Sequence, residues 1–85
     1  MKIHELKIES QYLNAIISRE KTFEIRLNDR DYEVNDILNL KGCDNGVYTG
    51  VGAVVEVTYA HEGLGLQEGY IAMSIECISS DILFR

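Results

Sequence analysis

Apolar and polar residues alternate along most of this chain, and one segment near its start has a helical period instead. Between the first two alternating segments, Leu13, Ile16 and Ile17 recur at the spacing of one helix face, which predicts a helix over residues 10–20. The predicted order is therefore strand, helix and then a run of strands. The alternation predicts strands in five segments, at residues 2–8, 22–27, 37–43, 47–60 and 70–78.

Local signals mark where these elements begin, end and bend. Either Glu9 or Ser10 can cap the helix, because each side chain carries an oxygen that accepts from a free backbone N–H. The Asp-Asn-Gly sequence at residues 44–46 is typical of a tight hairpin turn of type I′. Gly50 and Gly52 indicate a bulge or bend in the strand that follows. Polar or glycine-rich loops are expected at residues 28–36 and 61–69.

The inward faces of these elements predict the core and the fold class. An open sheet of short strands would expose its edges, so we expect the sheet to curl into a small β-barrel with the helix covering one opening. This is an α+β fold. The predicted core comprises Phe23, Ile25, Leu27, Leu38, Val55, Val57, Ile71 and Met73 from the strands and Leu13, Ile16 and Ile17 from the helix, with Val51, Ala53, Tyr59 and Ile75 on the same strand faces.

The length and composition limit the class of protein. The 85 residues, of which 46% are apolar and 26% charged, suit one soluble domain with a single core. We expect that domain to span residues 1–78, followed by a tail at 79–85 that the pattern does not place. No apolar run approaches the roughly 20 residues of a membrane span, and the start lacks the apolar stretch of a signal peptide. Cys43 and Cys77 are therefore expected as reduced thiols in a cytoplasmic protein. The spacing of cysteines and histidines fits no metal site, so neither metal nor cofactor is expected.

The charge distribution singles out one short stretch. A net charge of −6 argues against the broad basic footprint that wraps duplex DNA. Four of the eight lysines and arginines nevertheless lie between Arg19 and Arg30, which leaves room for a small cationic patch. Glu24 and Arg26 are same-face neighbours about 7 Å apart in the predicted strand, and Lys21 enters that strand. The candidate ligand-binding residues are Lys21, Glu24, Arg26 and Arg30.

Four landmarks in this order carry a resemblance to a known family. They are Lys-x-x-Glu-x-Arg at residues 21–26, Asn-Asp-Arg-Asp-Tyr at 28–32, Val-x-Asp-Ile-Leu at 34–38 and Leu-x-Glu-Gly-Tyr at 66–70. With them, residues 2–78 resemble a family of small bacterial and phage proteins of unknown function in the ASCH group of the PUA-like superfamily. Two glycines of the family pattern are replaced. Arg19 stands where a glycine ends the helix, and Asn35 stands in a turn whose left-handed conformation asparagine tolerates.

The resemblance implies a PUA-like barrel in which Lys21, Glu24 and Arg26 line a cleft between barrel and helix. Related domains bind RNA or are proposed to, so the expected function is binding of RNA, a nucleotide or another anionic ligand. Lysine and arginine would contact phosphates, Glu24 would accept from a base or hold Arg26, and Arg30 would extend the patch. Exposed tyrosines could stack on bases, although core packing is commoner for that residue type. The alternative for the charged triplet is a structural ion pair, worth about 0–1 kcal/mol when exposed.

Two other function classes remain open at this level. Some ASCH proteins resemble amidohydrolases that act on N-acetylated cytidine, with Lys21 matching their lysine. Their threonine nucleophile corresponds to Glu24 here, which cannot be activated by deprotonation as a hydroxyl is. If the protein is an enzyme, Lys21 and Glu24 are the catalytic candidates, with Glu24 as a general base. The third class is a phage or bacterial accessory protein whose acidic surface binds a host protein.

Overall fold

Each predicted alternating segment forms a strand in the computed structural model, which describes residues 1–82. The helix is shorter than its pattern, because the chain turns at Ser18 and Arg19. The elements are β1 (Ile3–Ile8), α1 (Ser10–Ile17), β2 (Phe23–Leu27), β3 (Ile37–Asp44), β4 (Val47–Glu62) and β5 (Tyr70–Ile82).

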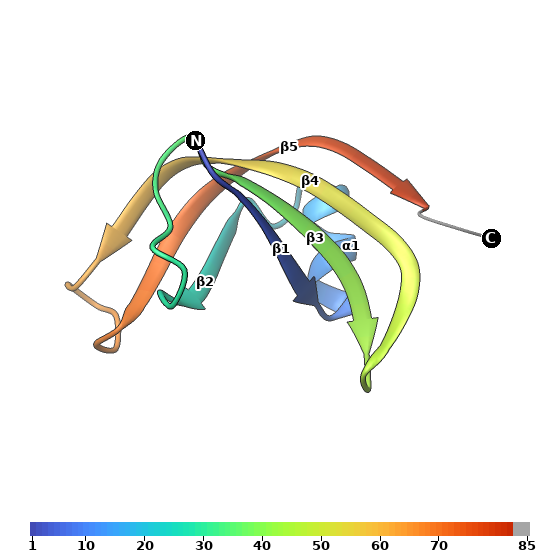
Figure 1. Ribbon diagram of the computed structural model, residues 1–85, viewed down its shortest axis with the longest axis horizontal. Coiled ribbons are helices and arrows are strands. Elements are labelled where there is room, and N and C mark those ends of the chain that lie inside the picture. The colour runs from blue at the N-terminus through green and yellow to red at the C-terminus, as the bar shows by residue number, and fades with distance from the viewer. Residues whose placement is uncertain (83–85) are drawn as a thin grey trace.

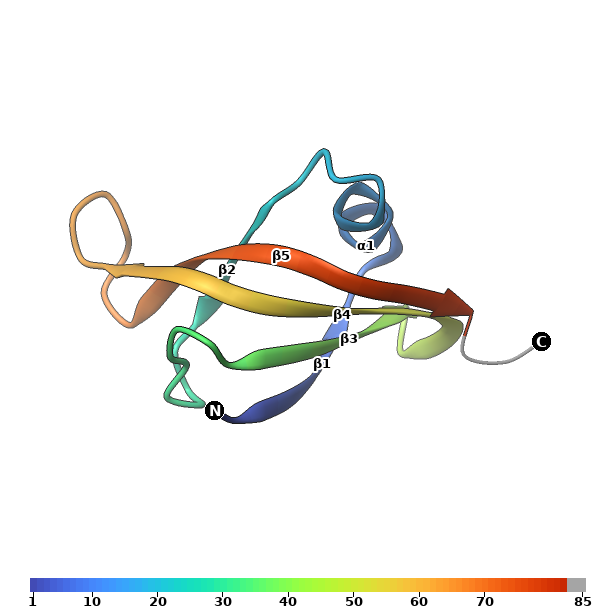
Figure 2. The same cartoon turned by 90° about the horizontal axis from the view of Figure 1, so that it is seen from above.

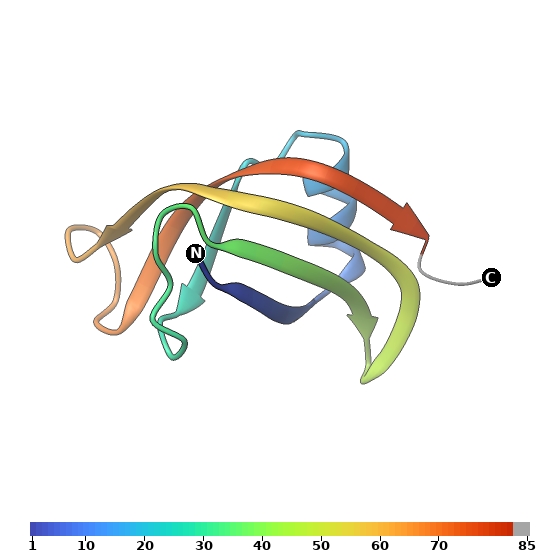
Figure 3. The ribbon, with the colours of Figure 1, turned by 45° about the horizontal axis from the view of Figure 1, so that its top comes forward.

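The five strands form one sheet in the order β1-β3-β4-β5-β2. β1 pairs with β3 in parallel, and the other neighbours are antiparallel. Figure 1 shows the sheet as an arch with α1 beneath it, and Figure 3 shows β1 and β2 as its two opposite edges. Within residues 1–82 no strand ladder joins these edges. The sheet was expected to close into a barrel, but it forms a curled half-barrel with one short helix.

Helix α1 is capped by a residue from another element. The backbone N–H of Ser10 donates to a carboxylate oxygen of Asp44, at the end of β3, over 2.9 Å, and the Ser10 hydroxyl donates to the other oxygen. These two bonds hold the pKa of the Asp44 carboxyl below its ordinary value. The predicted cap was wrong in part, because Glu9 occupies the N-cap position without a side-chain cap bond. The contact fixes α1 against the β3–β4 turn. Figure 2 shows α1 and the chain leading into β2 on the β5 side of the sheet, opposite β1.

Arg19 and Asn35, the two residues that stand where the resemblance implies glycines, both adopt a left-handed backbone conformation. Arg19 has φ 68° and Asn35 has φ 77°, both in the left-handed region. The helix ends in a Schellman arrangement, in which the N–H of Glu20 donates to Ala15 over 2.9 Å and that of Arg19 donates to Ile16 over 3.0 Å. Arg19 therefore accepts backbone strain that a glycine would avoid.

Most of the predicted core is confirmed. The buried apolar side chains fill the concave side of the sheet and its contact with α1, and Ile17 and Val51 pack against them partly buried. The confirmed core residues are Leu13, Ile16, Leu38, Ala53, Val55, Val57, Ile71, Met73 and Ile75.

The prediction for β2 was wrong in its choice of face. Phe23, Ile25 and Leu27 alternate as expected, but they are 47%, 49% and 52% exposed, whereas Glu24 is only 5% exposed. β2 is an edge strand, and its inward face meets the opposite edge of the sheet rather than more apolar core. A charged residue with partners can therefore occupy that face. Tyr59 is also exposed, because the β4–β5 register shifts just after Val57.

The turns follow their local sequence signals. Asn45 and Gly46 both have positive φ, 53° and 80°, as a type I′ turn requires, and Gly50, with φ 87°, lies where the β3–β4 register shifts. Residues 79–82, which the pattern left in an unplaced tail, continue β5 and pair with β4. Residues 83–85 of that expected tail lie outside the described residues.

Candidate functional site

The charged triplet of Lys21, just before β2, and Glu24 and Arg26, within it, forms one hydrogen-bonded cluster around a nearly buried carboxylate. Glu24 accepts from Lys21 Nζ on one oxygen and from Arg26 Nε, over 2.8 Å, on the other. Lys21 also donates to the backbone carbonyl of Phe23, over 2.7 Å, and its ammonium lies 4.7 Å from the centre of the Phe23 ring. The side chain of Lys21 is only 17% exposed, so it is held more firmly than a surface lysine. The cluster carries one net positive charge with its carboxylate fully paired.

Arginine side chains join the two free edges of the half-barrel. Arg26 Nη2 donates to the backbone carbonyl of Lys7 over 2.9 Å, and Arg30 Nη1 donates to that of Glu5 over 3.0 Å. Both carbonyls belong to β1, whereas Arg26 lies in β2 and Arg30 in the loop after it. Because an unpaired strand edge leaves carbonyls without partners, these arginines satisfy acceptors that a closed barrel would bond with backbone N–H groups.

We call the line where Arg26 and Arg30 connect to β1 the seam of the half-barrel. Two clefts lie side by side along this seam. The larger, of about 640 Å³, is lined by Ile8, Glu9 and Tyr12 at the β1–α1 junction and by residues of both faces of β2. The smaller, of about 360 Å³, lies between β1, Arg30, Lys41 and Tyr48. Residues that line both clefts are Lys7 and Arg26.

Basic side chains are concentrated in the two clefts, although the chain as a whole is acidic. Five of its eight basic residues line them, against three carboxylates. Of the candidate ligand-binding residues, Lys21, Glu24 and Arg26 line the larger cleft, and Arg26 and Arg30 line the smaller one. Lys7 and Lys41 were missed by sequence reasoning. Each is an outward residue of an alternating strand, and only the parallel pairing of β1 with β3, which sets Lys7 beside Lys41, brings them together.

One tyrosine is packed in the core, and three others line the clefts. Tyr32 is buried, and burial raises the pKa of its hydroxyl. Tyr12 and Tyr70 line the larger cleft, and Tyr48 lines the smaller one. Tyr12 is among the exposed large side chains, and the Lys21 ammonium lies 5.7 Å from its ring centre. The larger cleft thus combines aromatic and aliphatic walls with three cations, Lys7, Lys21 and Arg26.

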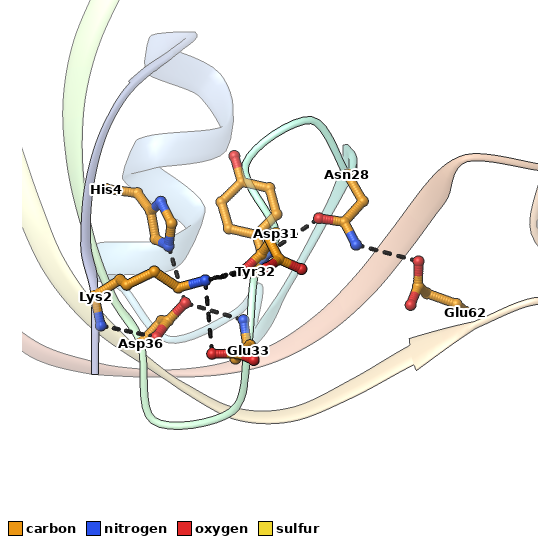
Figure 4. Close-up of polar contacts among 8 residues, drawn as sticks. All are labelled: Lys2, His4, Asn28, Asp31, Tyr32, Glu33, Asp36 and Glu62. Carbon is orange, nitrogen blue, oxygen red and sulfur yellow. Dashed lines mark hydrogen bonds and ion pairs between the residues drawn. The ribbon is translucent and has the colours of Figure 1, made fainter.

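A second polar cluster, at the opposite end of β1, is buried and ties the N-terminus to the turn before β3 (Figure 4). Asp36 accepts from His4 Nε2 and from the backbone N–H of Lys2, each over 2.9 Å, and from the N–H of Glu33 over 3.0 Å. Burial alone would raise the pKa of Asp36, but these hydrogen bonds outweigh it and lower that pKa to about 2. Because Asp36 is ionised, His4 donates the Nε2 proton. The ring of Tyr32 packs edge-on at 4.7 Å from that of His4.

The His4–Asp36 pair lines neither cleft, so we assign it a structural role. Within residues 1–82 no three His, Cys, Asp or Glu side chains come together as a metal site would require. Over the same residues, no helix has both the length and the apolar character to cross a membrane. The sequence could have suggested the pair only weakly, since His4 and Asp36 lie 32 residues apart.

Comparison with known proteins identifies the family. Residues 3–75 match the family described as a domain of unknown function, DUF3850. The chain is similar to an uncharacterized 12.9 kDa protein in the GpA 3' region of Escherichia phage P2, with 32% identity over 72 residues. That match covers 85% of this chain and 66% of the phage protein, so the chain spans just under two thirds of that relative.

The fold also has a solved counterpart. The crystal structure of hypothetical protein PH0355 is similar with a TM-score of 0.63, covering 92% of this chain and 100% of that chain. The sequence identity is 20%, so this likeness concerns the fold alone. The family match, in contrast, takes in both the charged triplet of β2 and most of the half-barrel that carries it. This protein therefore belongs to the DUF3850 family.

Proposed function

We propose that this protein is a PUA-like domain of the ASCH type that binds RNA or a nucleotide in the larger cleft. The observation that carries the proposal is the concentration of five cations along one seam of a chain whose net charge is −6. A local cationic cleft attracts a polyanion to one place without a broad basic surface. The two unbridged thiols, Cys43 and Cys77, suit the proposed cytoplasmic location.

The apolar wall of the larger cleft supports a ligand with a flat, uncharged part. Phe23, Ile25 and Leu27 line this cleft while remaining about half exposed. Exposed apolar residues in a row on an edge strand are a liability unless they serve a contact. Nucleobases stack on such surfaces, and the adjacent guanidinium and ammonium groups suit the phosphates that accompany a base.

The geometry favours binding over hydrolysis. Glu24, the general-base candidate, is nearly buried, and both its oxygens already accept from Lys21 and Arg26. A general base must reach the proton that it removes. Glu62, the last residue of β4, and Glu68, in the loop before β5, line neither cleft, and Glu62 accepts from Asn28 instead.

The test is a titration followed by backbone NMR. The isotope-labelled protein is titrated separately with the four nucleoside monophosphates, a short single-stranded RNA and inorganic sulfate as an anion control. We expect at least one nucleotide or the RNA to shift the signals of Tyr12, Lys21, Glu24 and Arg26 at concentrations where sulfate does not. If none of these ligands shifts any signal of the larger cleft, the proposal is wrong.

A further inference from the structure

The smaller cleft has the composition of an anion site. Four of its seven lining residues are cations, namely Lys7, Arg26, Arg30 and Lys41, and Glu5 is its one carboxylate. This excess of positive charge stands out in an acidic chain. Its walls carry little apolar surface compared with the larger cleft, whose lining includes four aliphatic or phenyl side chains. The two clefts therefore suit different parts of a ligand.

Several donors in the smaller cleft remain available. Within residues 1–82 Lys7 has no carboxylate at ion-pair distance, and its ammonium lies 5.7 Å from the centre of the Tyr48 ring. Arg30 donates one N–H group to the backbone carbonyl of Glu5, and the residue is otherwise exposed. A guanidinium has five N–H groups in a planar fork that matches phosphate oxygens.

Lys41 is partly neutralised. Its ammonium lies 2.9 Å from a carboxylate oxygen of Glu5, which is itself largely exposed. An exposed pair of this kind is worth about 0.2–1 kcal/mol, so an incoming anion can compete with Glu5 for Lys41. Glu5 is thus the one residue of the cleft that opposes an anion.

The two clefts are continuous through shared side chains. Lys7 and Arg26 line both of them, and Arg26 also holds Glu24 on the larger side. An anion in the smaller cleft would therefore lie next to any group bound in the larger one.

From this arrangement we propose that the smaller cleft is a phosphate subsite, so that the ligand lies across both clefts with its base in the larger and its phosphate in the smaller. The ligand class is a phosphorylated nucleoside, either a free nucleotide or a nucleotide unit of single-stranded RNA. This inference rests on the proposed function, since it assumes a base in the larger cleft. The arrangement predicts that the phosphate contributes affinity through Lys7, Arg30 and Lys41.

The experiment measures affinities of matched nucleosides, nucleoside monophosphates and one short single-stranded RNA for four forms of the protein. These are the parent, Lys7→Ala, Glu5→Gln and Arg19→Gly. Lys7 is chosen because its removal breaks no ion pair of the described residues. Arg19→Gly removes the same charge from a residue that lines neither cleft, which makes it the matched control for net charge.

We expect the parent to bind a monophosphate at least about tenfold more tightly than its nucleoside, as one charge-assisted hydrogen bond would give. Because Lys7 lines both clefts, the readout is the ratio of nucleotide affinity to nucleoside affinity, which Lys7→Ala should lower about five- to tenfold. Glu5→Gln should strengthen nucleotide binding by about two- to fivefold, because it frees Lys41. If RNA is the source of the phosphate, the oligonucleotide binds more tightly than the monophosphate and loses affinity in the same variants.

The outcomes separate the two proposals. If nucleosides and nucleotides bind equally well and Lys7→Ala behaves as Arg19→Gly does, the phosphate subsite is refuted while base binding in the larger cleft stands. If no nucleoside, nucleotide or oligonucleotide binds the parent, both proposals fail. Equal weakening by Lys7→Ala and Arg19→Gly would mean that only net charge matters, which also overturns the subsite.

Discussion

Among the charged residues, Arg26 is the one whose removal should lower the stability of the fold most. Its Nε donates to Glu24 over 2.8 Å, and its Nη2 donates to the carbonyl of Lys7 over 2.9 Å. Arg26→Ala therefore removes one of the two partners of a carboxylate that is only 5% exposed, and it also removes a bridge between β2 and β1. Both losses act on the seam that holds the half-barrel in its curled form.

The size of the effect follows from burial. Removing one partner of a fully buried ion pair costs about 3–5 kcal/mol. The Arg26 side chain is 23% exposed and Lys21 still contacts Glu24, so we expect a smaller loss of about 2–3 kcal/mol in the free energy of unfolding. In a domain of this size 1 kcal/mol corresponds to about 4–8 °C, so the melting temperature should fall by about 10–20 °C.

The assay is thermal and urea unfolding followed by circular dichroism. Arg26→Lys keeps the charge but loses the planar fork, so its melting temperature should lie between those of the parent and Arg26→Ala. Adding Glu24→Gln to Arg26→Ala removes the poorly paired charge and should recover part of the loss, a coupling that a double-mutant cycle measures. If Arg26→Ala melts within about 2 °C of the parent, corresponding to less than about 0.5 kcal/mol, the seam does not stabilise the fold.

Three further predictions concern pH, backbone strain and salt. The folded pKa of Asp36 is about 2 against an ordinary value of 3.8, so the unfolded chain binds the proton more readily. The stability that Asp36 contributes, about 2 kcal/mol, should be complete well above pH 4 and disappear as the pH falls towards about 2. Urea unfolding between these pH values should show a weaker dependence on pH in Asp36→Asn, and an unchanged dependence would contradict this. Arg19→Gly should raise the free energy of unfolding by about 0.5–1 kcal/mol, because it relieves the left-handed strain at φ 68°; a lower stability in the same assay would mean that the arginine side chain makes a compensating contact. If single-stranded RNA binds, contacts from three or four cations should give a slope of log affinity against log salt of about −2 to −3, and a titration several times steeper would reveal a basic surface outside the clefts.

Local sequence was sufficient to predict the strands, the helix and the hairpin turn. Period-two alternation located all five strands, and the Asp-Asn-Gly turn formed as expected, because both depend on neighbouring residues alone. The left-handed conformation at Asn35 was expected from the resemblance, which places a glycine there, and from the tolerance of asparagine for that conformation. The charged triplet was found for a similar reason, since Lys21, Glu24 and Arg26 lie within six residues of one another.

The tertiary structure alone decided which face of β2 turns inward. Alternation separates Phe23, Ile25 and Leu27 from Glu24 and Arg26, but it does not say which set meets the core. The apolar set was the natural choice by the hydrophobic effect. That choice of face was wrong because β2 is an edge strand of the sheet. Its inward face lies opposite the backbone carbonyls of β1, and those carbonyls need hydrogen-bond donors.

The tertiary structure also decided how far the site extends. Lys7 and Lys41 join it only because β1 pairs with β3 in parallel, in a register that sets these two residues side by side. Arg30 joins it by donating to a β1 carbonyl 25 residues away. A single sequence records which side chains a strand carries, whereas the pairing of distant strands depends on the whole chain closing around one core. The motif of β2 could therefore be read from the sequence, but the second cleft beside it could not.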